Sequence, residues 1–190
     1  LGSSAVGAIE AGGIGGRPAN PDANNPRTQS IFIFQIDHNQ TKKDSILVIN
    51  ASDQEQTIRL YAVDGQVTNT GSYTCRQEND ARVDVGKWIK LSKSEVTLAP
   101  NENVEVPFTI TAPAKADVGE HNGCVVFENK DDSDVEASGN VRVKTRQAIR
   151  VVATIPGDLK RDVTIESLEL ISKGDNLQYQ LALHNTGNVS

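Results

Sequence analysis

The sequence has little of several residue types that mark particular classes of protein. Methionine is absent, aromatic residues make up 4% of the chain, and the 190 residues include two cysteines and three histidines. No apolar run approaches the roughly 18 residues of a membrane-spanning helix, so we expect membrane contact only through an anchor outside this chain. The net charge of −6 argues against a nucleic-acid-binding protein that depends on overall charge.

The usual signatures of catalysis are missing as well. The chain has no GxSxG elbow, no HExxH pair and no phosphate-binding glycine loop followed by a helix. Its histidines, His38, His121 and His184, lie far apart in predicted loops or strand ends. Catalysis needs a nucleophile or an acid–base pair held in position. We therefore predict that the protein is not an enzyme and that it uses no cofactor or metal.

The two cysteines, Cys75 and Cys124, have neither CxxC spacing nor a set of histidine partners, which argues against a structural zinc site. In an oxidising compartment they would pair. Closing a loop of about 50 residues stabilises a fold by roughly 4 kcal/mol in the chain-entropy model. We predict a disulfide, with two separately buried thiols as the alternative.

The densest acidic stretch, residues 131–136 (DDSDVE), offers the oxygen ligands that Ca²⁺ prefers. Its spacing does not match the EF-hand pattern, because Gly139 falls too late. We therefore predict a solvated hairpin loop at this place rather than a calcium site.

Runs of strand length recur between turn residues from Thr28 onward. They cover residues 30–36, 45–50, 57–63, 104–110, 123–128 and 141–155. No window shows helical periodicity with capping residues. About seven short strands separated by Pro, Gly and Asn favour an all-β fold, an immunoglobulin-like β-sandwich. Trp88, beside Ile89 and Leu91, is expected in its core rather than as a stacking platform for sugar.

Composition divides the chain into three segments. Residues 1–27 hold six of the fifteen glycines and three prolines, which predicts a flexible N-terminal arm. Residues 28–157 form the sandwich. Residues 158–190 are expected to be a linker and the first strands of a second, incomplete β-sandwich, with strands over residues 163–171 and 177–184.

A basic row lies on the longest predicted strand, opposite its apolar face. It consists of Arg142, Lys144, Arg146 and Arg150. Residues two apart on a strand stand about 6.6 Å from each other on the same face. The row suits the carboxylates of peptidoglycan or the phosphates of wall polymers, and we take it as the candidate ligand-binding site. The alternative is cross-strand pairing with acidic neighbours, or protection of an exposed edge.

Several segments, taken in order, resemble a known family. They are residues 84–91 (DVGKWIKL), 94–100 (SEVTLAP), 104–110 (VEVPFTI), 118–123 (VGEHNG) and 148–157 (AIRVVATIPG). Together they resemble the DUF916-type module, the immunoglobulin-like peptidoglycan-binding domain of WxL-interacting bacterial cell-surface proteins, over roughly residues 28–157. The resemblance implies an extracellular protein of the cell surface or cell wall that binds peptidoglycan and associates with WxL proteins. It assigns no ligand site.

We accordingly predict a non-catalytic bacterial cell-surface binding or scaffolding module that attaches to peptidoglycan or another cell-wall polymer within a multi-domain surface protein. Its other expected partners are WxL-type surface proteins or copies of itself. The alternative is a structural subunit of a surface filament or pilus, in which the N-terminal arm adds a strand to a neighbour's sheet. A periplasmic chaperone of immunoglobulin fold ranks last, because no basic anchor in a subunit-binding cleft is evident.

Overall fold

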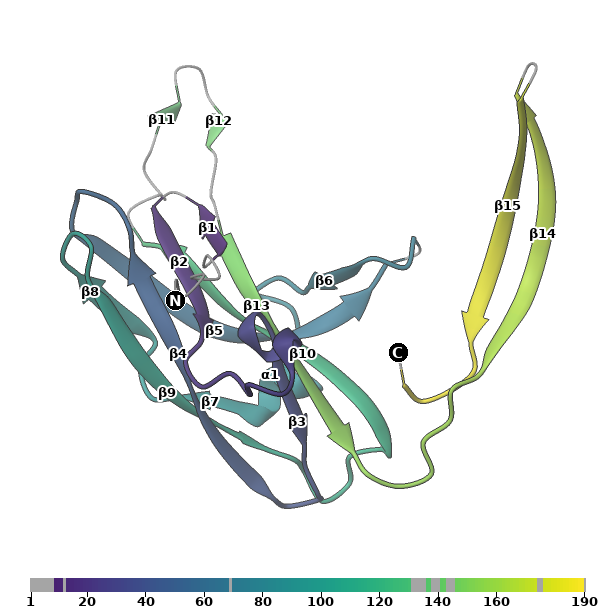
Figure 1. Ribbon diagram of the computed structural model, residues 1–190, viewed down its shortest axis with the longest axis horizontal. Helices are drawn as coiled ribbons and strands as arrows, with labels where there is room; N and C mark the ends of the chain where they lie inside the picture. The colour runs from purple at the N-terminus through teal and green to yellow at the C-terminus, as the bar shows by residue number, and fades with distance from the viewer. Residues whose placement is uncertain are drawn as a thin grey trace.

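The computed structural model describes residues 9–11, 13–68, 70–130, 136–137, 141–142, 146–173 and 176–189. Within these residues the chain is nearly all β, and two sheets face each other (Figure 1). The first sheet contains, in spatial order, β1 (Ile9–Ala11), β2 (Ile14–Pro18), β4 (Thr41–Asn50), β9 (Asn103–Thr111) and β7 (Ile89–Leu91). The second contains β3 (Phe32–Gln35), β13 (Arg146–Ile155), β10 (Gly119–Asn129), β5 (Gln56–Val67) and β6 (Tyr73–Cys75), with β8 (Glu95–Leu98) also paired to β5.

The remaining elements are short or lie outside the two sheets. They are a 3-10 helix, η1 (Pro26–Gln29), a single helical turn, α1 (Val85–Trp88), and two hairpins, β11–β12 (Glu136–Ala137 and Val141–Arg142) and β14–β15 (Val163–Lys173 and Asn176–Asn185). None of the helices in the described part of the chain is long and apolar enough to cross a membrane. The one turn at α1 was not predicted from the sequence.

Alternation of side chains builds the core between the sheets. On β9, Val106, Phe108 and Ile110 are buried, and the residues between them face outward. On β13 the alternate side chains Ile149, Val151, Ala153 and Ile155 likewise belong to the core cluster. Trp88 is 8% exposed and lies in this cluster, as predicted. The structure therefore confirms the all-β, immunoglobulin-like sandwich.

The N-terminal segment differs from the prediction of a flexible arm. Residues 14–18 form β2, which pairs with β4 from Ile14 opposite Asn50 to Pro18 opposite Ile46. Ile14 is buried, and its carbonyl oxygen accepts a hydrogen bond of 2.9 Å from Gln147. A Cβ on Gly16 would lie 2.7 Å from a ring atom of Phe127. The glycine here allows close packing of the backbone, so the arm prediction is wrong for this strand.

Two strand boundaries also differ from the sequence reading. Within the predicted strand over residues 141–155, the described residues belong to two strands: β13 covers Arg146–Ile155, and Val141–Arg142 pairs with Glu136–Ala137. The strand predicted over residues 57–63 is longer in the structure, because β5 continues to Val67 and Asp64 is buried within it. The Asp64 carboxylate accepts backbone hydrogen bonds from Val83, Asp84 and Gly86, which hold α1 against β5.

The strands predicted over residues 163–171 and 177–184 are present as the β14–β15 hairpin, which extends away from the sandwich (Figure 1). Asn188, just beyond the hairpin, contacts the sandwich. Its side-chain amide donates to the carbonyl oxygen of Val118 at 3.1 Å, and its own carbonyl oxygen accepts from the Glu120 amide at 2.7 Å. Gly119 makes room for it, because a Cβ there would lie 2.3 Å from the Asn188 carbonyl oxygen.

Candidate functional site

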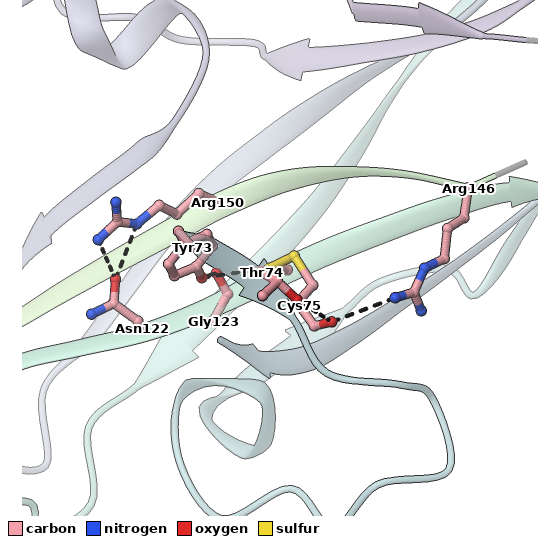
Figure 2. The surroundings of a disulfide bond; sticks show 8 residues. Tyr73, Thr74, Cys75, Asn122, Gly123, Arg146 and Arg150 are labelled. Carbon is pink, nitrogen blue, oxygen red and sulfur yellow. Dashed lines mark hydrogen bonds between the residues drawn. A yellow bond between two sulfur atoms is a disulfide. The ribbon is translucent and has the colours of Figure 1, made fainter. Parts of the chain in front are cut away.

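A disulfide joins Cys75 of β6 to Cys124 of β10, as predicted, with the two Cα atoms 5.9 Å apart. Figure 2 shows the disulfide and its surroundings. The bond lies on the outer face of the second sheet, in a small apolar cluster with Tyr61, Val63 and Val126. β6 is only three residues long and pairs with β5 at the edge of the sheet. The disulfide therefore fixes this short strand over β10.

Tyr73, two residues before Cys75, supports one arginine of the predicted basic row. Its hydroxyl donates to the carbonyl oxygen of Gly123 at 2.7 Å, and the Arg150 guanidinium lies 4.2 Å from the centre of its ring. Burial raises the pKa of Tyr73 to about 12, so the hydroxyl stays protonated. Gly65 makes this arrangement possible, because a Cβ there would lie 2.1 Å from the Tyr73 hydroxyl oxygen.

Arg150 is held from its other side by polar partners on β10. Its Nη2 donates to Asn122 Oδ1 at 2.7 Å (Figure 2). The same atom donates to Glu120 Oε1 at 3.2 Å. A guanidinium with stacking and hydrogen bonding of this kind has a fixed orientation. The contacts of Arg150 therefore match the alternative considered for the basic row, which is cross-strand pairing with an acidic neighbour.

Arg146 lies at the other end of the same face. It donates to the Cys75 carbonyl oxygen at 3.4 Å (Figure 2). It also lines a polar hollow of about 310 Å³. The hollow is also lined by Tyr61, Gln77, Glu78, Asn79 and Glu128. Amide, carboxylate and guanidinium groups around a tyrosine present both donors and acceptors. Such a set can hydrogen-bond to hydroxyl, amide and carboxylate groups of a ligand.

The carboxylate at the base of this hollow, that of Glu128, has its negative charge balanced by an arginine partner. Glu128 is buried, and the register places it directly between Arg59 of β5 and Arg146 of β13. Arg59 pairs with Glu128 through Nε at 3.0 Å and through Nη2, and with Glu78 at 2.8 Å. The hydrogen bond to Glu128 raises the pKa of Arg59. Burial raises the pKa of Tyr61.

We call this surface the arginine face. It comprises Arg59, Tyr61, Tyr73, Glu128, Arg146 and Arg150. The structure places Arg146 and Arg150 of the predicted row on it, whereas Lys144 and the side chain of Arg142 lie outside the described residues. Residues 131–135 of the acidic stretch also lie outside them. The row as a ligand site stays a prediction.

Sequence reasoning missed the partners of these arginines. The alternation of β5 places Arg59 and Tyr61 on the face opposite Ile58 and Leu60, which is readable from the sequence. That Glu128 lies opposite Arg59 depends on the register between β5 and β10, which are far apart along the chain. No local pattern carries that information.

Comparison with known proteins identifies the family of this chain. A family described as "WxL Interacting Protein, peptidoglycan binding domain" matches residues 17–129, more than half of the chain. The chain belongs to this family. The match begins within β2, in agreement with the inclusion of that strand in the fold. No curated protein matches the sequence.

Solved structures similar to this WxL-interacting protein domain share little sequence with it. A chain of the chaperone–tip adhesin complex of CFA/I fimbriae is 18% identical with a TM-score of 0.47, over 83% of this chain, and the class 5 fimbriae chaperone CfaA is 15% identical with a TM-score of 0.46, over 84%. A family 123 glycoside hydrolase from Clostridium perfringens is 9% identical with a TM-score of 0.50, over 75%. The chain spans 65% of each fimbrial chain and 27% of the hydrolase chain, and the likeness concerns the fold alone.

Proposed function

We propose that this WxL-interacting protein domain attaches non-covalently to peptidoglycan at the bacterial cell surface. The observation that carries the proposal is the family match over residues 17–129, because the family is described as a peptidoglycan-binding domain. That description is of a binding domain and not of a catalyst. Association with a WxL-type surface protein is part of the same proposal, since the family is named for it.

The arginine face is the proposed contact surface. Peptidoglycan is a glycan with acylated amino groups and peptide stems that end in carboxylates. The amides of Gln77 and Asn79 suit hydroxyl and acyl-amide groups, and the ring of Tyr61 forms the floor beside them. Arg146 offers a planar donor fork for a carboxylate. Arg150, held by Tyr73, Asn122 and Glu120, lies further along β13 on the same face.

A co-sedimentation assay tests this proposal with purified peptidoglycan from which phosphate-bearing polymers have been removed. We expect the full chain to sediment, and a Gln77→Ala/Asn79→Ala/Arg146→Ser variant to bind about tenfold more weakly or worse, because charged hydrogen bonds are lost. A matched control is Gln54→Ala/Asn24→Ala/Arg161→Ser, which removes the same residue types at exposed positions elsewhere.

The co-sedimentation assay has two distinct negative outcomes. A full chain that stays in the supernatant would refute peptidoglycan attachment itself. If the wild type sediments and the Gln77→Ala/Asn79→Ala/Arg146→Ser variant binds equally well, attachment uses another face.

The filament alternative gains no support from the fold. Strand addition by the N-terminal arm requires a segment free to join a neighbour's sheet. Residues 14–18 are instead paired with β4 of their own chain, and Ile9–Ala11 pairs with β2.

A further inference from the structure

The outer face of the first sheet carries two adjoining hollows, on the opposite side of the sandwich from the arginine face. One has a volume of about 570 Å³ and the other about 400 Å³. Lys90 of β7 and Thr109 of β9 line both, so they form the boundary between the two. Lys43 lines the first hollow and Lys87 the second. We call this surface the lysine groove, defined by Lys43, Lys87, Lys90 and Thr109.

The register of three strands arranges these side chains in a line. Lys43 on β4 and Lys90 on β7 both lie directly opposite Thr109 on the central strand β9. Adjacent strands are about 4.8 Å apart, so the two lysine Cα atoms are separated by roughly 10 Å. Lys87 follows one turn earlier, in α1. Further along β4 and β9, Thr41 and Thr111 join their hydroxyls at 2.9 Å. The groove therefore presents ammonium groups at intervals, with hydroxyls between them.

The lysine groove carries a net positive charge. Within the part of the chain that the structure describes, none of its three lysines forms an ion pair, whereas Lys130 pairs with Glu95 at 2.9 Å and Lys160 with Asp158 at 3.5 Å. One carboxylate, that of Asp44, also lies at the first hollow, where its Oδ1 accepts hydrogen bonds from Asn20 and from the Ser45 amide, so three ammonium groups face a single negative charge. Unpaired cations along a groove attract an anionic ligand, here in a chain whose net charge is −6.

Apolar side chains complete the groove. Leu91 and Pro107 contribute to the first hollow, and Trp88 and Pro113 to the second. Such a floor contacts the carbon skeleton of a ligand while the ammonium groups contact its charges. Lysine provides compact point charges rather than the planar fork that selects single carboxylates, which suits a flexible chain with recurring anionic groups.

We infer that the lysine groove binds a linear wall polymer linked by phosphodiesters, in addition to the peptidoglycan contact on the other sheet. The inference rests on the proposed location of the domain at the cell wall, where peptidoglycan and anionic polymers lie together. Because the two surfaces are on opposite outer faces of the sandwich, one domain would contact both polymers at once.

Binding of the full chain to synthetic poly(glycerol phosphate) tests this inference, at low and at high ionic strength. We expect a Lys43→Gln/Lys87→Gln/Lys90→Gln variant to lose binding by roughly 100-fold at low salt, since each lysine near a polyanionic surface contributes several-fold. Wild-type binding should weaken as salt rises, because screening shortens the reach of exposed charges. The control Lys115→Gln/Lys130→Gln/Lys160→Gln removes the same number of charges elsewhere and should bind as the wild type does.

Two further ligands distinguish binding of a phosphodiester polymer from binding of peptidoglycan and from binding of lipid. On peptidoglycan freed of phosphate polymers, the groove variant should sediment as the wild type does; an equal loss there would assign the lysines to peptidoglycan and overturn the inference. Vesicles containing phosphatidylglycerol should bind more weakly than the polymer, and equal binding would point to lipid phosphates instead. Unchanged polymer binding by the groove variant would also overturn it. The outcomes with poly(glycerol phosphate) and with vesicles do not depend on whether the wild type binds polymer-free peptidoglycan, and that binding tests the proposed function.

Discussion

At the scale of single residues, His121 connects β10 to the segment that leads into α1. Its Nδ1 lies 2.7 Å from Asp84 Oδ1 and its Nε2 lies 2.8 Å from the carbonyl oxygen of Asp117, while its ring lies against Trp88. With an acceptor at each nitrogen, the doubly protonated ring is favoured. The hydrogen bond to Asp84 accordingly raises the pKa of His121 above its ordinary value of 6.5.

This contact predicts a pH-dependent contribution to stability. Because the folded pKa is raised, the contribution is complete below the unfolded pKa of about 6.5 and is lost as pH rises through the higher folded pKa. Urea unfolding of wild type and His121→Gln should show a larger difference in free energy at about pH 5.5 than at about pH 8.5. His38→Gln serves as the control, away from Asp84. Equal differences at both pH values would refute the role of this histidine.

At the scale of elements, β2 shows how glycines can belong to a packed strand. Gly15 and Gly16 lie within it, and the side chain of Gln147 reaches the carbonyl oxygen of Ile14 from β13. Small residues allow the backbone to approach Phe127, which larger side chains would prevent. The strand therefore contributes hydrogen bonds and the buried side chains of Ile14 and Pro18 to the sandwich.

A substitution at Ile14 distinguishes a structural strand from a dispensable arm. We predict that Ile14→Ala lowers the free energy of unfolding by about 2–4 kcal/mol, because it removes buried methyl groups from the core. Asn24→Ala, at an exposed position of the same N-terminal region, should change stability by less than about 0.5 kcal/mol. Chemical denaturation measures both variants, and similar stabilities for the two would contradict the assignment of β2.

At the scale of the whole molecule, the β14–β15 hairpin exposes one continuous apolar face. A register shift between Ile165 and Ser167 keeps the apolar residues in phase, so that Ile165 lies opposite Leu183 and Leu168 opposite Leu181. The large apolar side chains of this face, from Val163 to Leu183, are 50–68% exposed. An isolated hairpin is marginal in water, and such a face requires a cover. We propose that the hairpin forms the first strands of a second β-sandwich, packed against a further sheet.

The apolar face predicts a measurable property of this chain. Leu168→Ser/Leu181→Ser should reduce the fluorescence of a dye that binds exposed apolar surface, and leave the unfolding of the sandwich unchanged, because neither side chain contributes to its core. Gln178→Ser/Gln180→Ser, on the opposite face of the hairpin, is the matched control. Unaltered dye binding in the leucine variant would contradict an exposed apolar face.

Much of the fold was predictable because it follows from local patterns. The alternation of residues 104–110 and 149–155 identified inward-facing side chains correctly, and Trp88 between apolar neighbours was correctly expected in the core. The candidate site was predictable only in part. Arg146 and Arg150 were identified as outward-facing, but the tyrosines and carboxylates around them come from strands remote in sequence.

The sequence by itself determined the all-β class, the inner faces of the strands, that Cys75 and Cys124 are the two cysteines available for a disulfide, and the resemblance to a peptidoglycan-binding family. These follow from side-chain periodicity, a small cysteine inventory and ordered motifs. Only the tertiary structure decided that Glu128 lies between two arginines, that two lysines flank Thr109, and that residues 14–18 join the sheet. The physical reason is that cross-strand neighbours are set by strand order and register, which depend on how the whole core closes and not on any short stretch of residues.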